Sequence, residues 1–140
     1  MTKNFIQANP RAYSYESNDC TVRATTLAMG LDYIEVHKKF TSAGRKERRG
    51  VTLHVMEKAL SLITGKSKRF SMGYEAIKNR HPYDFAYPSF AKFAKLHPKG
   101  KFIVIKRGHA VALINGVWYD AHADQVGSRC IVKAYYQIEE

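Results

Sequence analysis

A cysteine, a histidine and an aspartate occur in this sequence in settings that would let them act together as an activated nucleophile. Cys20 follows Ser17-Asn18-Asp19, three favourable N-cap residues, so we expect its thiol in the first turn of a helix. The helix dipole and the free N–H groups of a first turn favour a thiolate over a thiol. A histidine beside the thiol would take its proton, and a carboxylate on the far ring nitrogen would orient that histidine. Groups arranged in this way attack carbonyl carbons.

A predicted β-hairpin supplies the histidine and the carboxylate. Two apolar-rich runs, 110–114 and 117–121, flank Asn115-Gly116, a dipeptide typical of two-residue hairpin turns because both residues tolerate positive φ. The turn fixes the register, which pairs Ile114 with Val117, Ala112 with Tyr119, and Val111 with Asp120. Period-two alternation then places His109 and Asp120 on one face as diagonal neighbours. His122 falls on the same face and is an alternative third residue.

Three helices are predicted before the hairpin, and the first of them must position Cys20. It ends at Gly30 and carries an apolar stripe of Ala24, Leu27, Ala28 and Leu31, with Val22 beside it. The second begins at Asp32, where Glu35 completes a capping box and Leu31 and Val36 form a hydrophobic staple; its buried face is Tyr33, Val36 and Phe40. The third is capped by Thr52, ends at Gly65 and buries Leu53, Met56, Leu60 and Ile63.

The pattern changes from helices to strands near residue 100. A short strand near 67–72, a helical turn near 74–79 and a short helix over 89–96 precede that change, the last with Phe90, Phe93 and Ala94 inward. Strands are then predicted over 102–106, in the hairpin and over 130–138. Residues 1–16 read as an irregular arm. The sequence therefore predicts one α+β domain over 17–140, with a helical half (17–97) packed on an antiparallel sheet half (101–138).

Composition narrows the class of protein. A chain of 140 residues that is 45% hydrophobic is long enough for one globular domain with its own core. It has no apolar run of about 18 residues, and its first residues lack the apolar core of a signal peptide. We therefore expect a cytoplasmic monomer without membrane contact. The two cysteines, Cys20 and Cys130, are expected to be reduced, and Cys130 alternates with core positions, as a structural residue would.

The net charge of +11 predicts an affinity for nucleic acid or acidic proteins. A glycine-bounded loop concentrates this charge in Arg45, Lys46, Arg48 and Arg49. The loop is a candidate contact for nucleic acid, and a solvated loop without a dedicated partner is the alternative.

Each candidate residue also has a purely structural interpretation. Cys20 could be a small buried apolar residue, His109 a hydrogen-bonded strand residue, and Asp120 the end of a strand. Zinc is a competing use of the same residues, but they lack a compact ligand motif and Cys20 has no Cys-x-x-Cys partner, so we predict no metal and no cofactor. In the nucleophilic interpretation, the backbone N–H of Cys20 and the Asn18 side chain are candidates for binding the developing oxyanion.

The chain order of a cysteine at a helix start, a histidine on a strand and a polar residue on the next strand resembles papain-like cysteine peptidases. The resemblance is most specific to small bacteriophage-encoded proteins of the C39 type, through NDCTVRA at 18–24, PKGKFIV at 98–104, GHAVA at 108–112 and NGVWYD at 115–120. It implies a papain-like fold and a catalytic Cys20, His109 and Asp120 acting on an amide or related acyl bond. A phage enzyme of this kind would act in the host cytoplasm on a peptide or protein, including an acidic one. NlpC-type cell-wall hydrolases share the order but carry a histidine as third residue, which points to His122.

We therefore expect a cysteine hydrolase that cleaves a peptide, isopeptide or related amide bond. Two alternatives remain open at this point. One is an inactive papain-like scaffold that binds an acidic host protein or nucleic acid, and the other is an NlpC-type cell-wall hydrolase.

Overall fold

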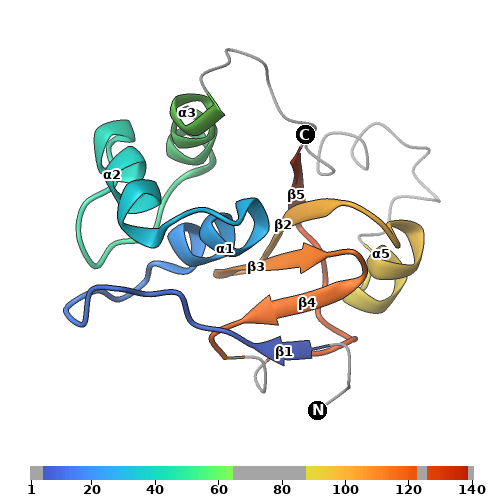
Figure 1. Ribbon diagram of the computed structural model, residues 1–140. Helices are drawn as coiled ribbons and strands as arrows, with labels where there is room; N and C mark the ends of the chain where they lie inside the picture. The colour runs from blue at the N-terminus through green and yellow to red at the C-terminus, as the bar shows by residue number, and fades with distance from the viewer. Residues whose placement is uncertain (1–4, 65–87, 123–125, 139–140) are drawn as a thin grey trace.

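The protein is an α+β structure in which helices pack against a five-stranded mixed sheet (Figure 1). A computed structural model describes residues 5–64, 88–122 and 126–138. The helices of these residues are α1 (Cys20–Met29), α2 (Tyr33–Ala43), α3 (Leu53–Thr64) and α5 (Phe90–Leu96). The strands are β1 (Phe5–Gln7), β2 (Lys101–Lys106), β3 (His109–Ile114), β4 (Val117–Asp120) and β5 (Ala134–Ile138). The strand order is β1-β4-β3-β2-β5.

The predicted hairpin is confirmed as β3 and β4. Asn115 and Gly116 form its turn with φ of 48° and 81°, the positive values that a two-residue turn requires. Ile114 pairs with Val117 and Ala112 with Tyr119, as predicted. The ladder stops there, one step before the predicted pair of Val111 and Asp120.

The N-terminal arm is not wholly irregular, and here the sequence prediction was wrong. Residues 5–7 form β1, which runs parallel to β4 at the edge of the sheet and makes the sheet mixed rather than antiparallel. Phe5 is buried and stacks on Trp118 with ring centroids 6.0 Å apart. A strand of three residues is too short to show an alternating pattern, so only its partner strand reveals it.

The sheet separates two apolar clusters. Ile103, Ala110, Ala112 and Tyr136 face a cluster with α1, α2 and α3. Phe102, Val104, Val111 and Leu113 face another that contains Trp118 and the α5 residues Phe90 and Phe93. Figure 1 shows α5 apart from the other three helices, at the far side of the sheet. Successive side chains of β2 and β3 therefore enter two different packed clusters, one on each face of the sheet. Helix α1 packs against β3 on one of these faces.

Three of the predicted helix ends carry the signals expected from the sequence, and the predicted cap of α2 does not form. Gly30 ends α1 in the left-handed conformation, Thr52 Oγ1 accepts a hydrogen bond from the Val55 N–H, and Ser89 caps α5 through the Lys92 N–H. The predicted capping box and staple of α2 do not form. The Asp32 side chain makes no capping bond, and Leu31 is 46% exposed because Gly30 turns the chain away from the α1 stripe.

The last strand is shorter than the sequence predicted. The last strand, predicted over 130–138, is confined to Ala134–Ile138, and the residues before it contribute only an isolated bridge between Ile131 and Ser89. The predicted strand near 67–72, the turn near 74–79 and the helix stop at Gly65 lie outside the described residues.

Candidate active site

Helix α1 brings Cys20 against the start of β3, where His109 lies. The Cys20 thiol lies beside the His109 ring and the backbone of Ala110, and both lower its pKa. Cys20 is the first residue of α1, so it lies at the helix end where N–H groups are free and the helix dipole is positive. The structure therefore joins the two residues that the sequence analysis paired as nucleophile and base.

Asp120, at the end of β4, holds the other side of the His109 ring. His109 Nε2 lies 2.9 Å from Asp120 Oδ2, and the Asp120 carboxylate is buried with 4% exposure. The same oxygen accepts a hydrogen bond from the backbone N–H of His122, at 3.1 Å. Because Nε2 is engaged with Asp120, Nδ1 is the ring nitrogen that remains for proton exchange with Cys20. His122, the alternative third residue, thus contributes its backbone to Asp120, and Asp120 contacts His109.

The three side chains shift one another's protonation. Burial opposes ionisation of Cys20, but the hydrogen bond and positive charge of His109 outweigh it and hold the pKa of the Cys20 thiol below its usual value. Burial likewise disfavours the imidazolium, yet Asp120 and Cys20 raise the pKa of His109 to about 9. For Asp120, burial is again outweighed by His109, which holds the pKa of the carboxyl below its usual value. The group therefore favours a thiolate beside an imidazolium.

Arg23 is a site residue that the sequence analysis missed. It lies three residues after Cys20, on the same side of α1, and its charge contributes to lowering the pKa of both Cys20 and Asp120. The signal was present in the sequence as an arginine one helical turn after the cysteine. It was overlooked because charged residues on helices usually face solvent.

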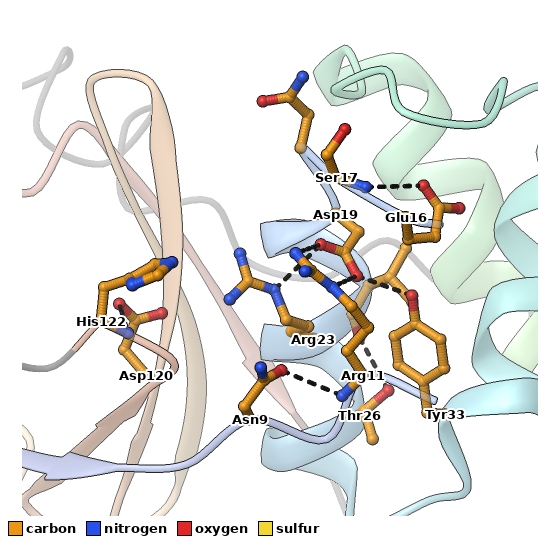
Figure 2. Close-up of polar contacts among 12 residues, drawn as sticks. Asn9, Arg11, Glu16, Ser17, Asp19, Arg23, Thr26, Tyr33, Asp120 and His122 are labelled. Atoms are coloured by element: carbon orange, nitrogen blue, oxygen red, sulfur yellow. Dashed lines mark hydrogen bonds and ion pairs between the residues drawn. The ribbon is translucent and has the colours of Figure 1, made fainter. Parts of the chain in front are cut away.

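A buried ionic cluster around Asp19 holds Arg23 and the start of α1 (Figure 2). Arg11 donates to Asp19 through Nε at 3.1 Å and through Nη2 at 2.6 Å, and the Tyr33 hydroxyl donates at 2.7 Å. Arg23 Nε lies 3.2 Å from the same carboxylate. Asp19 therefore uses its oxygens for these partners, which explains why its side chain does not cap α1. Through Asp19, the residue before Cys20, the cluster links α1 to Tyr33 of α2 and to Arg11 of the segment before α1.

A second buried carboxylate, Glu16, anchors the basic loop. Arg45 donates to Glu16 through both terminal nitrogens at 2.8 and 3.1 Å, His37 Nε2 lies 2.6 Å away, and the Arg48 N–H donates at 2.9 Å. Arg45 is 5% exposed, so this predicted nucleic-acid contact is a buried ion-pair partner instead. Lys46, Arg48 and Arg49 are exposed. Arg45 and the Arg48 backbone thus tie the loop to Glu16, while its other three basic side chains remain exposed to solvent.

Two cavities meet at Cys20 and His109. The larger, of about 460 Å³, is lined on its charged side by Arg11, Arg23, Lys106 and Arg107 and also reaches Asn18 and His122. The smaller, of about 220 Å³, is mainly apolar and is lined by Val51, Met56 and Ile105, with Thr21 at its edge. Lys106 and Gly108 border both. A chain lying through the two cavities would pass directly over the Cys20 sulfur.

The two candidate donors for the oxyanion differ in whether they already donate a hydrogen bond within the protein. The Asn18 amide donates to the Arg48 carbonyl at 3.0 Å, in a residue with φ of 53°. The backbone N–H of Cys20 lies in the first turn of α1, where helix N–H groups have no partner within the helix. The Cys20 N–H is therefore the better placed donor, and Asn18 serves to fasten the basic loop.

The second cysteine lies on the other face of the sheet. Cys130 packs beside the cluster of Phe90, Phe93 and Trp118, and its sulfur accepts a hydrogen bond from the Gly127 N–H at 3.4 Å. Both cysteines are free thiols. Within residues 5–64, 88–122 and 126–138, no three His, Cys, Asp or Glu side chains are grouped as metal ligands. No helix in this part of the chain is both long and apolar enough to cross a bilayer.

Comparison with protein-family models, with curated proteins and with solved structures finds no match for this chain.

Proposed function

We propose that this protein is a cysteine hydrolase of papain-like fold that cleaves a peptide, isopeptide or related amide bond. The observation that carries the proposal is the chain of contacts from the Cys20 thiol through the His109 ring to the buried Asp120 carboxylate. A purely structural role for Cys20 does not explain an imidazole beside its thiol, and a purely structural role for His109 does not explain a thiol at a helix start beside its ring. The resemblance of segments 18–24 and 108–120 to papain-like peptidases supports the same proposal.

The first half of the reaction follows from the preferred protonation states. The Cys20 thiolate attacks the carbonyl carbon of the scissile bond and forms a tetrahedral intermediate. The Cys20 N–H, at the positive end of α1, stabilises the negative oxygen of that intermediate. The His109 imidazolium then gives its proton to the leaving nitrogen, which departs as an amine and leaves an acyl group on Cys20.

The second half reverses the role of His109. The neutral imidazole takes a proton from water, and the resulting hydroxide equivalent attacks the acyl carbon. Collapse of the second intermediate releases the acid and restores the thiolate and imidazolium. Asp120 orients the ring through both halves and stabilises its charged form.

An activated ester tests the proposal without knowledge of the natural substrate. The protein is incubated with p-nitrophenyl acetate, p-nitrophenol release is followed, and the acylated residue is located by mass spectrometry. We expect a burst of release and an acetyl group on Cys20 that then turns over. Cys130→Ala should behave like the wild type, whereas Cys20→Ala and His109→Ala should lose the burst. Equal acylation of both cysteines, or release unaffected by loss of Cys20, would contradict the proposal.

A further inference from the structure

Arg23 lines the larger cavity, and two of its guanidinium nitrogens have no hydrogen-bond partner among the described residues. Its side chain is 7% exposed, and its Nε lies 3.2 Å from Asp19 without the alignment of a hydrogen bond. Its Nη1 is buried and has no hydrogen-bond partner among the described residues. A buried donor left without a partner destabilises a protein, because water no longer compensates it. Arg23 lines the cavity, so an acceptor bound there would lie beside its guanidinium.

The charge of this cavity specifies the kind of acceptor. Its described lining contains four cationic side chains, Arg11, Arg23, Lys106 and Arg107, and no carboxylate. Arg11 is held by Asp19, and Asp19 carries one negative charge against the two arginines that contact it. Arg11, Arg23 and Asp19 together therefore carry one net positive charge. Lys106, at the end of β2, and Arg107, in the turn that follows, add two more.

The position of Arg23 relates this charge to the reacting atoms. Figure 2 shows its guanidinium on the side of α1 that faces Asp120 and His122, away from Tyr33. Arg23 and Cys20 line the same cavity from adjacent turns of one helix. A group bound by Arg23 therefore lies within one or two residues of the bond that Cys20 attacks.

We propose that the larger cavity binds a carboxylate of the substrate next to the scissile bond, with Arg23 as the specificity-determining residue. This inference rests on the proposed hydrolase function and adds the substrate class to it. The planar fork of a guanidinium matches the two oxygens of a carboxylate, and Lys106 and Arg107 supply further charge at the mouth. The smaller cavity is mainly apolar, and Lys106, which borders both cavities, is the one lysine or arginine in its described lining, so selection for charge is concentrated in the larger cavity.

Two alkylating reagents that differ in charge test this inference. Iodoacetate and iodoacetamide both alkylate a thiolate with loss of iodide, but only iodoacetate carries a carboxylate. The rate constant of each reagent at Cys20 is measured by mass spectrometry in the full-length protein at low salt, with Cys130 as the reference thiol. Their ratio cancels any change in thiolate content. We expect the iodoacetate preference at Cys20 to exceed that at Cys130 and to fall about tenfold in Arg23→Gln, the effect of losing one charged hydrogen bond.

Two further variants keep the test decisive. Lys106→Gln with Arg107→Gln lies at the accessible mouth of the cavity, so it lowers the preference even if Arg23→Gln fails to fold. Lys92→Gln removes the same charge from exposed α5 and should leave the preference unchanged. A Cys20 that reacts rapidly with iodoacetamide, but whose preference is equal in all variants, overturns the inference alone. A Cys20 as slow as Cys130 with both reagents overturns the proposed function, and the inference with it.

Matched peptides distinguish the two sources of the carboxylate. One set, blocked at both ends, compares Glu with Gln near the scissile bond, and another compares a free with an amidated C-terminus. A fall in kcat/KM in the first set identifies an acidic side chain, and a fall in the second identifies a chain end. Cleavage that is indifferent to both changes overturns the inference.

Discussion

The two cysteines of this protein are chemically identical and similarly half-buried, yet they lie in different surroundings. Cys20 begins a helix, contacts a histidine held by a buried carboxylate, and borders two cavities. Cys130 lies across the sheet beside an aromatic cluster and accepts one backbone hydrogen bond. The difference between them is one of partners rather than of exposure, and it indicates that only Cys20 is prepared for nucleophilic chemistry.

The two buried carboxylates near Cys20 show a related contrast. Glu16 is enclosed by Arg45, His37 and backbone N–H groups, and each of the three guanidinium nitrogens of Arg45 has a hydrogen-bond partner. The Asp19 cluster leaves Arg23 Nη1 without a partner beside a cavity. The Glu16 network therefore fixes the chain, whereas the Asp19 network includes an arginine that lines the cavity next to Cys20.

The largest expected effect comes from removing each thiol in turn. Cys20→Ala should lower hydrolysis of an activated ester or a peptide substrate by about 10⁴-fold or more, because the nucleophile is lost. Cys130→Ala should leave the rate within about twofold and lower the free energy of unfolding by about 1 kcal/mol, as for a small change in a packed cluster. Steady-state kinetics and urea unfolding of the two variants measure both effects. Comparable activity losses would remove the distinction between the cysteines.

A second variant tests the ionic support of the Cys20 segment. Glu16→Gln keeps the shape of the side chain but leaves buried Arg45 without a counter-charge, so we expect a loss of about 3 kcal/mol in the free energy of unfolding at pH 7. Arg45 and His37 hold the pKa of Glu16 well below its ordinary value of 4.5 despite the opposing effect of burial. The stabilisation it provides is therefore present above that value and is lost as pH falls.

Urea unfolding at pH 7 and at about pH 3 measures this dependence, because acid protonates Glu16 when the chain unfolds. The wild type should lose more stability on acidification than Glu16→Gln does. Glu35→Gln is the matched control, since Glu35 is exposed on α2 and its ion-pair partner among the described residues is Lys38, at 3.6 Å. An equal effect of the two substitutions would show that the Glu16 network contributes little.

A smaller effect is expected when the third residue is made neutral. In Asp120→Asn the amide oxygen can still accept from His109 Nε2, so the ring stays in place but its charged form is less stable. The pKa of His109 should then fall from about 9, and the alkaline limb of the activity profile should move to lower pH. We expect a loss of about tenfold in kcat/KM at neutral pH, which corresponds to about 1.4 kcal/mol.

His122→Asn is the control for this prediction, because His122 is the other residue that could have served as the third member. Its activity and pH profile should remain close to those of the wild type. A greater loss in His122→Asn than in Asp120→Asn would reverse the assignment of the two residues.

The sequence alone predicted the parts of the site that depend on local patterning. The Asn115-Gly116 turn determined the register of β3 and β4, and Ser17-Asn18-Asp19 correctly indicated a helix start at Cys20, although the Asp19 side chain makes no capping bond. It could not predict β1, whose three residues are a strand only because β4 is beside them. It also could not predict that Arg23 and Arg45 are buried, because their carboxylate partners come from the irregular segment before α1. Tertiary ion pairs have no periodicity by which a sequence reveals them.

The central claim is that Cys20 is a thiolate because His109 makes it one, and the rate of its alkylation against pH tests that claim most directly. Iodoacetamide labelling of Cys20 and Cys130 is followed by mass spectrometry in the wild type and in His109→Ala. We predict that Cys20 reacts faster than Cys130 at neutral pH, and that its rate rises with a midpoint below the usual thiol value of 9.0. In His109→Ala that midpoint should move upward while the rate of Cys130 stays unchanged. A Cys20 profile that is the same with and without His109 would contradict the account.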